Sequence, residues 1–123
     1  MAFKTRLVAA PLAFALLPAP VFADEVKIMS ATARKSGGAW TISVTLEHGD
    51  TGWDHYADLW QVLSPRGEVL GERVLLHPHV DEQPFTRSLS GVVIPDGVKS
   101  VVLRADDKVH GFSPDTFELA LPD

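Results

Sequence analysis

A strict alternation of apolar and polar residues between positions 40 and 47 restricts the fold more than any other feature of this 123-residue chain. The apolar residues of this stretch alternate with the polar ones: Trp40, Ile42, Val44 and Leu46 against Thr41, Ser43, Thr45 and Glu47. A period of two is typical of a β-strand with one face on a core and the other in water. His48 continues the buried parity, so we expect its side chain to point into the rim between two layers of strands.

Six further short strands are predicted from runs of branched, aromatic and leucine residues that are bounded by turn signals. Their expected ranges are 25–34, 56–63, 68–76, 85–93, 98–105 and 116–121. Proline and glycine favour chain reversal at three points between them, namely 35–38, 64–67 and 95–97. The whole pattern predicts an all-β domain, a seven-stranded antiparallel sandwich of the immunoglobulin-like type, with Trp60 of the third strand in its core.

Residues 1–23 have the pattern of a secretory signal peptide. Lys4 and Arg6 supply the positive charge, residues 7–20 are almost wholly apolar, and small residues precede Asp24 at the expected cleavage point. The apolar run is too short for a comfortable membrane span, and prolines interrupt it. We therefore expect a periplasmic or secreted protein whose domain covers residues 24–123 and which leaves the membrane after cleavage. An uncleaved anchor is the alternative.

Charge and cysteine content exclude several functions. Without residues 1–23, nine Lys and Arg remain against sixteen Asp and Glu, a balance of about −7. This charge argues against nucleic acid and anionic lipid as partners and is compatible with binding a cation. The absence of cysteine from the sequence excludes thiol chemistry, iron–sulfur clusters and cysteine-ligated zinc. No pairing of a nucleophile with a base is visible in the sequence.

All five histidines are expected at one end of the predicted sandwich. Because consecutive strands alternate in direction, the loops after the second, fourth and sixth strands meet at the same end. These loops contain every histidine of the chain: His48, His55, His77, His79 and His110. Imidazole is a common ligand of zinc, copper and non-haem iron, and a carboxylate such as Asp107 can complete the shell. The other loop acids, Asp50 among them, are interpreted as ordinary solvated residues.

Two segments resemble the iron domain of superoxide reductase (desulfoferrodoxin). His48, followed by a short polar loop and then by Asp54-His55-Tyr56 and Trp60, is similar to the paired-histidine stretch of that family. Asp107-Lys108-Val109-His110-Gly111 is similar to its later Cys-Asn-x-His-Gly motif. The resemblance implies an immunoglobulin-like fold.

The same resemblance implies that ferrous iron is bound by His48, His55 and His110, with His77 or His79 as a fourth ligand from outside the family pattern. Asp107 stands where the family has its cysteine ligand. A carboxylate does not replace the electron donation of a thiolate to iron. The resemblance therefore favours iron binding over superoxide reduction, and it leaves open whether the protein is an enzyme.

Two functions remain from the sequence. The first is an exported protein that binds a transition metal at its histidine-rich end, with iron favoured by the resemblance and copper or zinc as alternatives. The second is a metal-free periplasmic module that contacts another protein through its loops or an edge strand, with Trp53 as the natural anchor residue. A sandwich fold hosts many functions, so the fold does not choose between them.

Overall fold

Residues 25–123, which the computed structural model describes, form eight β-strands and no helix. The strands are β1 (Lys27–Ser36), β2 (Ala39–Glu47), β3 (Ala57–Leu63), β4 (Val69–Val74), β5 (Phe85–Val92), β6 (Ser100–Asp107), β7 (Gly111–Phe112) and β8 (Phe117–Ala120). Within these residues no helix exists that could cross a membrane. The predicted signal peptide, residues 1–23, lies outside the described range.

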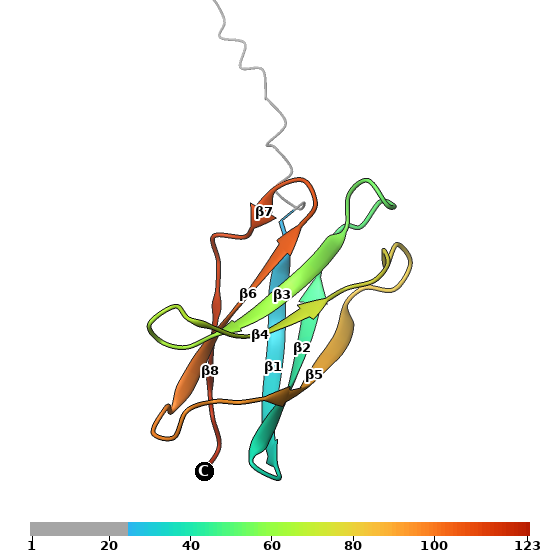
Figure 1. Cartoon of the computed structure of the whole chain (residues 1–123). Helices are drawn as coiled ribbons and strands as arrows, with labels where there is room; N and C mark the ends of the chain where they lie inside the picture. The colour runs from blue at the N-terminus through green and yellow to red at the C-terminus, as the bar shows by residue number, and fades with distance from the viewer. Residues whose placement is uncertain (1–24) are drawn as a thin grey trace, which may run out of the picture.

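The strands form two antiparallel sheets that face each other (Figure 1). One sheet has the order β1-β2-β5, and the other has the order β4-β3-β6-β7 with β8 also paired to β6. Two twisted sheets packed face to face bury the inward side chains of both. The predicted all-β sandwich is therefore confirmed.

The core lies between the two sheets. The four alternating apolar residues of β2 are all buried on one side of it. Trp60 of β3 is completely buried on the other side, and so are Val101 and Leu103 of the neighbouring strand β6. The predicted alternation of β2 and the predicted core position of Trp60 are thus both confirmed.

The structure differs from the prediction by one additional strand. A strand lies in each of the seven predicted ranges, and β7 pairs its two residues with Asp106 and Asp107 at the end of β6. Gly111 makes this tight return possible because its φ of +77° is a conformation that residues with a Cβ rarely adopt. Two residues are too few to show a period of two, so alternation cannot reveal this strand.

Three connections gather at one end of the sandwich (Figure 1). They are residues 48–56 between β2 and β3, residues 75–84 between β4 and β5, and residues 108–110 between β6 and β7. The first and third lie at the top of the view in Figure 1, and the second lies below the first at the right. All five histidines belong to these connections, as the alternation of strand direction predicts.

Side chains tie these connections to one another. Gln83 accepts a hydrogen bond from the backbone N–H of His48 (3.0 Å) and donates one to the carbonyl oxygen of His79 (2.9 Å). The backbone N–H of Lys108 donates to the carbonyl oxygen of Tyr56 (3.1 Å). The three connections therefore form one interlocked surface above the core.

Candidate metal centre

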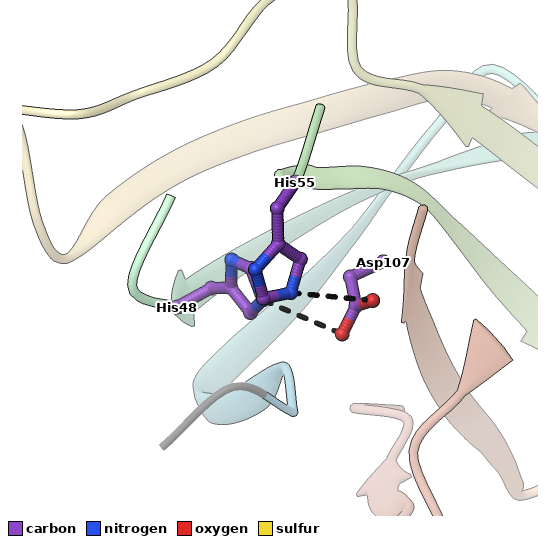
Figure 2. A group of neighbouring side chains, drawn as sticks. All are labelled: His48, His55 and Asp107. Atoms are coloured by element: carbon purple, nitrogen blue, oxygen red, sulfur yellow. Dashed lines mark ion pairs between the residues drawn. The ribbon is translucent and has the colours of Figure 1, made fainter. Parts of the chain in front are cut away.

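His48, His55 and Asp107 converge at this end of the sandwich (Figure 2). One potential ligand atom from each of the three lies within 4.8 Å of the other two. Nε2 of His48 is 3.4 Å from Oδ2 of Asp107, and Nε2 of His55 is 3.6 Å from Oδ1 of the same carboxylate. The two imidazole rings stand nearly perpendicular, with their centroids 4.8 Å apart. Two imidazole nitrogens and a carboxylate thus surround one point.

Strand parity explains why the three side chains meet. His48 follows the last residue of β2 and keeps the inward direction of Leu46, while Asp107 ends β6 on the same inward face as Ala105. Ala57, the first residue of β3, pairs with Asp107, so the connection that carries His55 reaches β3 beside this carboxylate. The side chains of His48 and Asp107 are fully buried, whereas that of His55 is 15% exposed. The group therefore closes the upper end of the core.

Asp107 is held as an anion by the turn that follows it. Its Oδ1 accepts hydrogen bonds from the backbone N–H groups of Val109 (2.8 Å) and His110 (2.6 Å), and Nδ1 of His110 lies 3.1 Å from both oxygens. Burial alone would raise the pKa of Asp107, but these hydrogen bonds and the His110 ring lower that pKa below its ordinary value. A buried carboxylate that stays ionised is suited to binding a cation.

Nε2 of His55 strengthens the case for a cation. This atom is inaccessible to solvent and has no hydrogen-bond partner among the described residues. A buried polar atom without a partner is costly, by about 1–3 kcal/mol, and such atoms are rare in folded proteins. A metal ion between His55 and Asp107 would give this nitrogen a partner.

Asp50 lies behind His48 and was not singled out by the sequence. Its Oδ1 lies 2.5 Å from Nδ1 of His48 and 3.0 Å from the N–H of Ala57, and its Oδ2 accepts the N–H of His79 (2.7 Å). The Asp50 side chain is fully buried, which contradicts its interpretation as a solvated loop residue. The sequence indicated this position only through its place two residues after His48, whose side chain was expected to point inward. The two hydrogen-bond donors from Ala57 and His79 could not be foreseen.

His110 lies at the edge of the group. Its ring centroid is 5.2 Å from that of His55, and its side chain is 38% exposed. Its Nδ1 contacts Asp107, but the three atoms that lie within 4.8 Å of one another do not include one from His110. His110 therefore borders the solvent side of the site.

His77 and His79 lie apart from this group, in the connection between β4 and β5. The His79 ring stacks on Phe85 at a centroid distance of 3.8 Å, and its Nε2 is 2.8 Å from a guanidinium nitrogen of Arg87. A guanidinium only donates, so the lone pair of this Nε2 is already engaged. Burial, and then the charges of Arg87 and His77, lower the pKa of His79. His77 is exposed, and its Nδ1 lies 3.0 Å from the carbonyl oxygen of Pro78. Of the six predicted ligands, the structure thus brings three together and places His110 beside them.

Two acidic residues on neighbouring strands, Asp58 of β3 and Asp106 of β6, lie near the site. Asp106 alternates with Asp107 and so faces away from the core. Burial raises the pKa of Asp106 to about 8, helped by the hydrogen bond and charge of Asp58 and by the charges of Asp107 and Glu72. Asp106 therefore takes up a proton more readily than an ordinary aspartate, which reduces the negative charge beside the site.

The fold and this side-chain group define an all-β sandwich protein with a candidate metal centre at one end. The chain is similar to a protein of Halomicrobium mukohataei that carries the name "Putative lipoprotein", with 45% identity over 89 residues. The matched region is 72% of this chain but 43% of the relative, so the chain spans less than half of that protein's length. Neither a known protein family nor a solved structure matches the chain.

Proposed function

We propose that this chain is an exported protein that binds one transition-metal ion through His48, His55 and Asp107. The observation that carries the proposal is the convergence of their ligand atoms within 4.8 Å at the interlocked end of the sandwich. Two histidines and one carboxylate are the donor set typical of non-haem ferrous iron, and zinc accepts the same donors. We propose iron as the metal, with zinc and copper as alternatives.

The residues present fit such an ion. Oδ1 of Asp107 accepts hydrogen bonds from two backbone N–H groups, whereas its Oδ2 points toward His48. Asp107 can therefore supply Oδ2 as one oxygen ligand. A metal bound by three protein side chains retains room for a further ligand, and it would supply Lewis acidity or redox chemistry there. His110, at the solvent edge, is placed to act as a fourth ligand or to contact a molecule that enters.

A relation to the superoxide reductase iron domain is part of this proposal. It is supported by the strand order, in which β1-β2-β5 faces a sheet built on β4-β3-β6, the immunoglobulin-like order that we propose for this fold. It is also supported by Asp107, which stands at the family's cysteine position and belongs to the ligand group. We do not extend the proposal to superoxide reduction, because the thiolate is absent.

Export of the protein is proposed on two grounds. The pattern of residues 1–23 is that of a signal peptide, and the relative from Halomicrobium mukohataei carries the name "Putative lipoprotein", where lipoproteins are a class of exported proteins. The sequence contains no cysteine, so the sandwich forms without a disulfide. The metal ion would thus be bound outside the cytoplasm.

Elemental analysis of untagged protein tests the metal site. We expect close to one equivalent of metal in the parent protein after anaerobic loading with ferrous iron, or after loading with zinc or copper. His55→Ala and Asp107→Asn should lose it, because each removes one of the three ligands. His77→Ala is the matched control, since it removes an exposed histidine outside the group and should leave the metal content unchanged. Equal metal content in all four proteins would contradict the proposal.

The exposure of Trp53 favours a second candidate function, a metal-free module that contacts another protein. Its side chain is 62% exposed and lines a groove of about 510 Å³ together with Pro78 and Val80. Exposed tryptophans are common anchors of protein interfaces. Under this alternative the parent binds no metal, and a partner captured by the parent is lost on Trp53→Ala but kept by His55→Ala.

A further inference from the structure

The buried carboxylate of Asp50 accepts contacts from three different parts of the molecule. Its Oδ1 faces Nδ1 of His48 and the backbone N–H of Ala57, and its Oδ2 faces the backbone N–H of His79. These groups belong to the end of β2, the start of β3 and the connection before β5. Both oxygens are therefore in use, in a place that solvent does not reach.

The hydrogen atoms of these contacts can be assigned from chemistry. Backbone N–H groups always donate, and an ionised carboxylate accepts hydrogen bonds but donates none. The proton between Asp50 and His48 therefore belongs to Nδ1 of the imidazole. In a neutral ring the other nitrogen, Nε2, then carries the lone pair, and this nitrogen is the one that lies 3.4 Å from Asp107.

We propose that Asp50 is a positioning residue that fixes the tautomer and the ring orientation of His48, so that Nε2 is presented to a metal ion. The inference rests on the proposed function. Metal-binding histidines commonly donate their second ring N–H to a carboxylate, which orients the ring and raises its basicity. Asp50 also joins the metal site to the connection that carries His79, because its Oδ2 accepts the backbone N–H of that residue.

A purely structural role for Asp50 is the rival explanation, because its carboxylate also satisfies the N–H groups of Ala57 and His79. The tautomer of His48 separates the two roles, because only a positioning role fixes it, and Asp50→Asn perturbs both kinds of contact. If the new amide nitrogen takes the place of Oδ2, it opposes the N–H of His79, donor against donor. If it takes the place of Oδ1, it opposes the N–H of Ala57, donates to Nδ1 of His48 and forces the ring proton onto Nε2. Either orientation disturbs the site without changing its volume.

Nitrogen NMR of the metal-free protein tests the inference directly. At mildly alkaline pH, where ordinary imidazoles are neutral, we expect His48 of the parent to be the tautomer protonated at Nδ1. A His48 ring protonated at Nε2 in the parent would overturn the inference, and this measurement needs no variant that could fail to fold. In Asp50→Asn we expect the Nε2-protonated form to gain population, while the exposed control Asp54→Asn should keep the parent spectrum.

Metal titration provides the second measurement. Asp50→Asn should bind zinc or ferrous iron about 10–100-fold more weakly than the parent while still reaching one equivalent at saturation. Asp54→Asn should match the parent. Unchanged affinity in Asp50→Asn would overturn the positioning role even if the parent binds metal. Absence of metal from the parent would instead overturn the proposed function, while the NMR result would still decide what Asp50 does to His48.

Discussion

Two buried histidines of this protein differ in what their ring nitrogens face. His48 has a carboxylate at each end of its ring, with Asp50 at Nδ1 and Asp107 at Nε2. His79 is similarly buried, but its Nε2 is 2.8 Å from the guanidinium of Arg87, while the nearest oxygens of Asp50 and Glu82 are 3.9 Å from its ring nitrogens. The lone pair of His79 is therefore engaged by a donor, whereas both ring nitrogens of His48 lie close to carboxylates. This difference, rather than burial, distinguishes the candidate ligand from the histidine that packs against Phe85.

The first prediction at the residue scale concerns pH. Burial and the charge of Arg87 lower the pKa of His79 below its ordinary value of 6.5 in the folded protein. The unfolded chain therefore takes up a proton at His79 at a pH where the folded chain does not. His79 consequently lowers the free energy of unfolding as the pH falls below about 6.5.

His79→Gln tests this effect because glutamine offers Arg87 an acceptor but does not titrate. Urea unfolding of metal-free protein at a series of pH values should show a steeper acid loss of the free energy of unfolding in the parent than in the variant. Both proteins contain the same other titratable groups, so the difference between their two curves reports the contribution of His79. Parallel curves for the two proteins would show that His79 does not contribute.

At the scale of elements, a ladder of hydroxyl groups fixes the register of β2 against β5. Thr45 contacts Thr86 and Ser43 contacts Ser88, both at 2.7 Å, on the solvent face of the three-stranded sheet. The register also pairs Leu46 with Phe85, directly below the site. This register brings the end of β2, where His48 lies, next to the start of β5.

A double-mutant cycle on this ladder gives the second prediction. Thr45→Ala and Thr86→Ala should show a favourable coupling of about 0.2–1 kcal/mol in the free energy of unfolding, the range for cross-strand pairs. Thr41→Ala with Thr86→Ala is the control, because Thr41 contacts Ser90 instead and the two changes should be additive. Equal coupling in both cycles would mean that the hydroxyl pair itself contributes nothing.

The close approach of β4 to β5 gives the third prediction. A Cβ added at Gly71 would lie 2.9 Å from a methyl group of Leu89 and 3.4 Å from one of Val92. We expect Gly71→Val to lower the free energy of unfolding by about 1–3 kcal/mol, the usual cost of overpacking. Adding Leu89→Ala should offset part of this loss, so that the double variant is more stable than the two separate losses predict. If the two changes in the free energy of unfolding were strictly additive, the strain in Gly71→Val would not come from its contact with Leu89.

At the scale of the whole molecule, the parts that were predictable are those that depend on a repeating pattern. Alternation in β2 and the turn signals predicted seven strands and the end at which the histidines gather. The role of Asp50 was not predictable, since it depends on N–H groups from two other segments. The separation of His79 from the site was also hidden, because β4 ends at Val74 and the chain then turns His79 toward Arg87.

The last prediction follows from the position of the three proposed ligands in the fold. His48, His55 and Asp107 lie at the end of β2, before β3 and at the end of β6, so a shared ion would join both sheets. An ion that binds only the folded state stabilises it by about 2.7 kcal/mol at a concentration of one hundred times its Kd. For a domain of this size, that corresponds to a rise of roughly 10–20 °C in Tm.

Thermal unfolding followed by circular dichroism should show this rise on addition of metal and its reversal by a chelator. His77→Ala should respond like the parent, because His77 lies outside the ligand group. His55→Ala should unfold at a Tm that metal does not change, because one of the three links is missing. A similar rise in His55→Ala would place the ion elsewhere on the molecule, because the proposed site needs the imidazole of His55 to bind it.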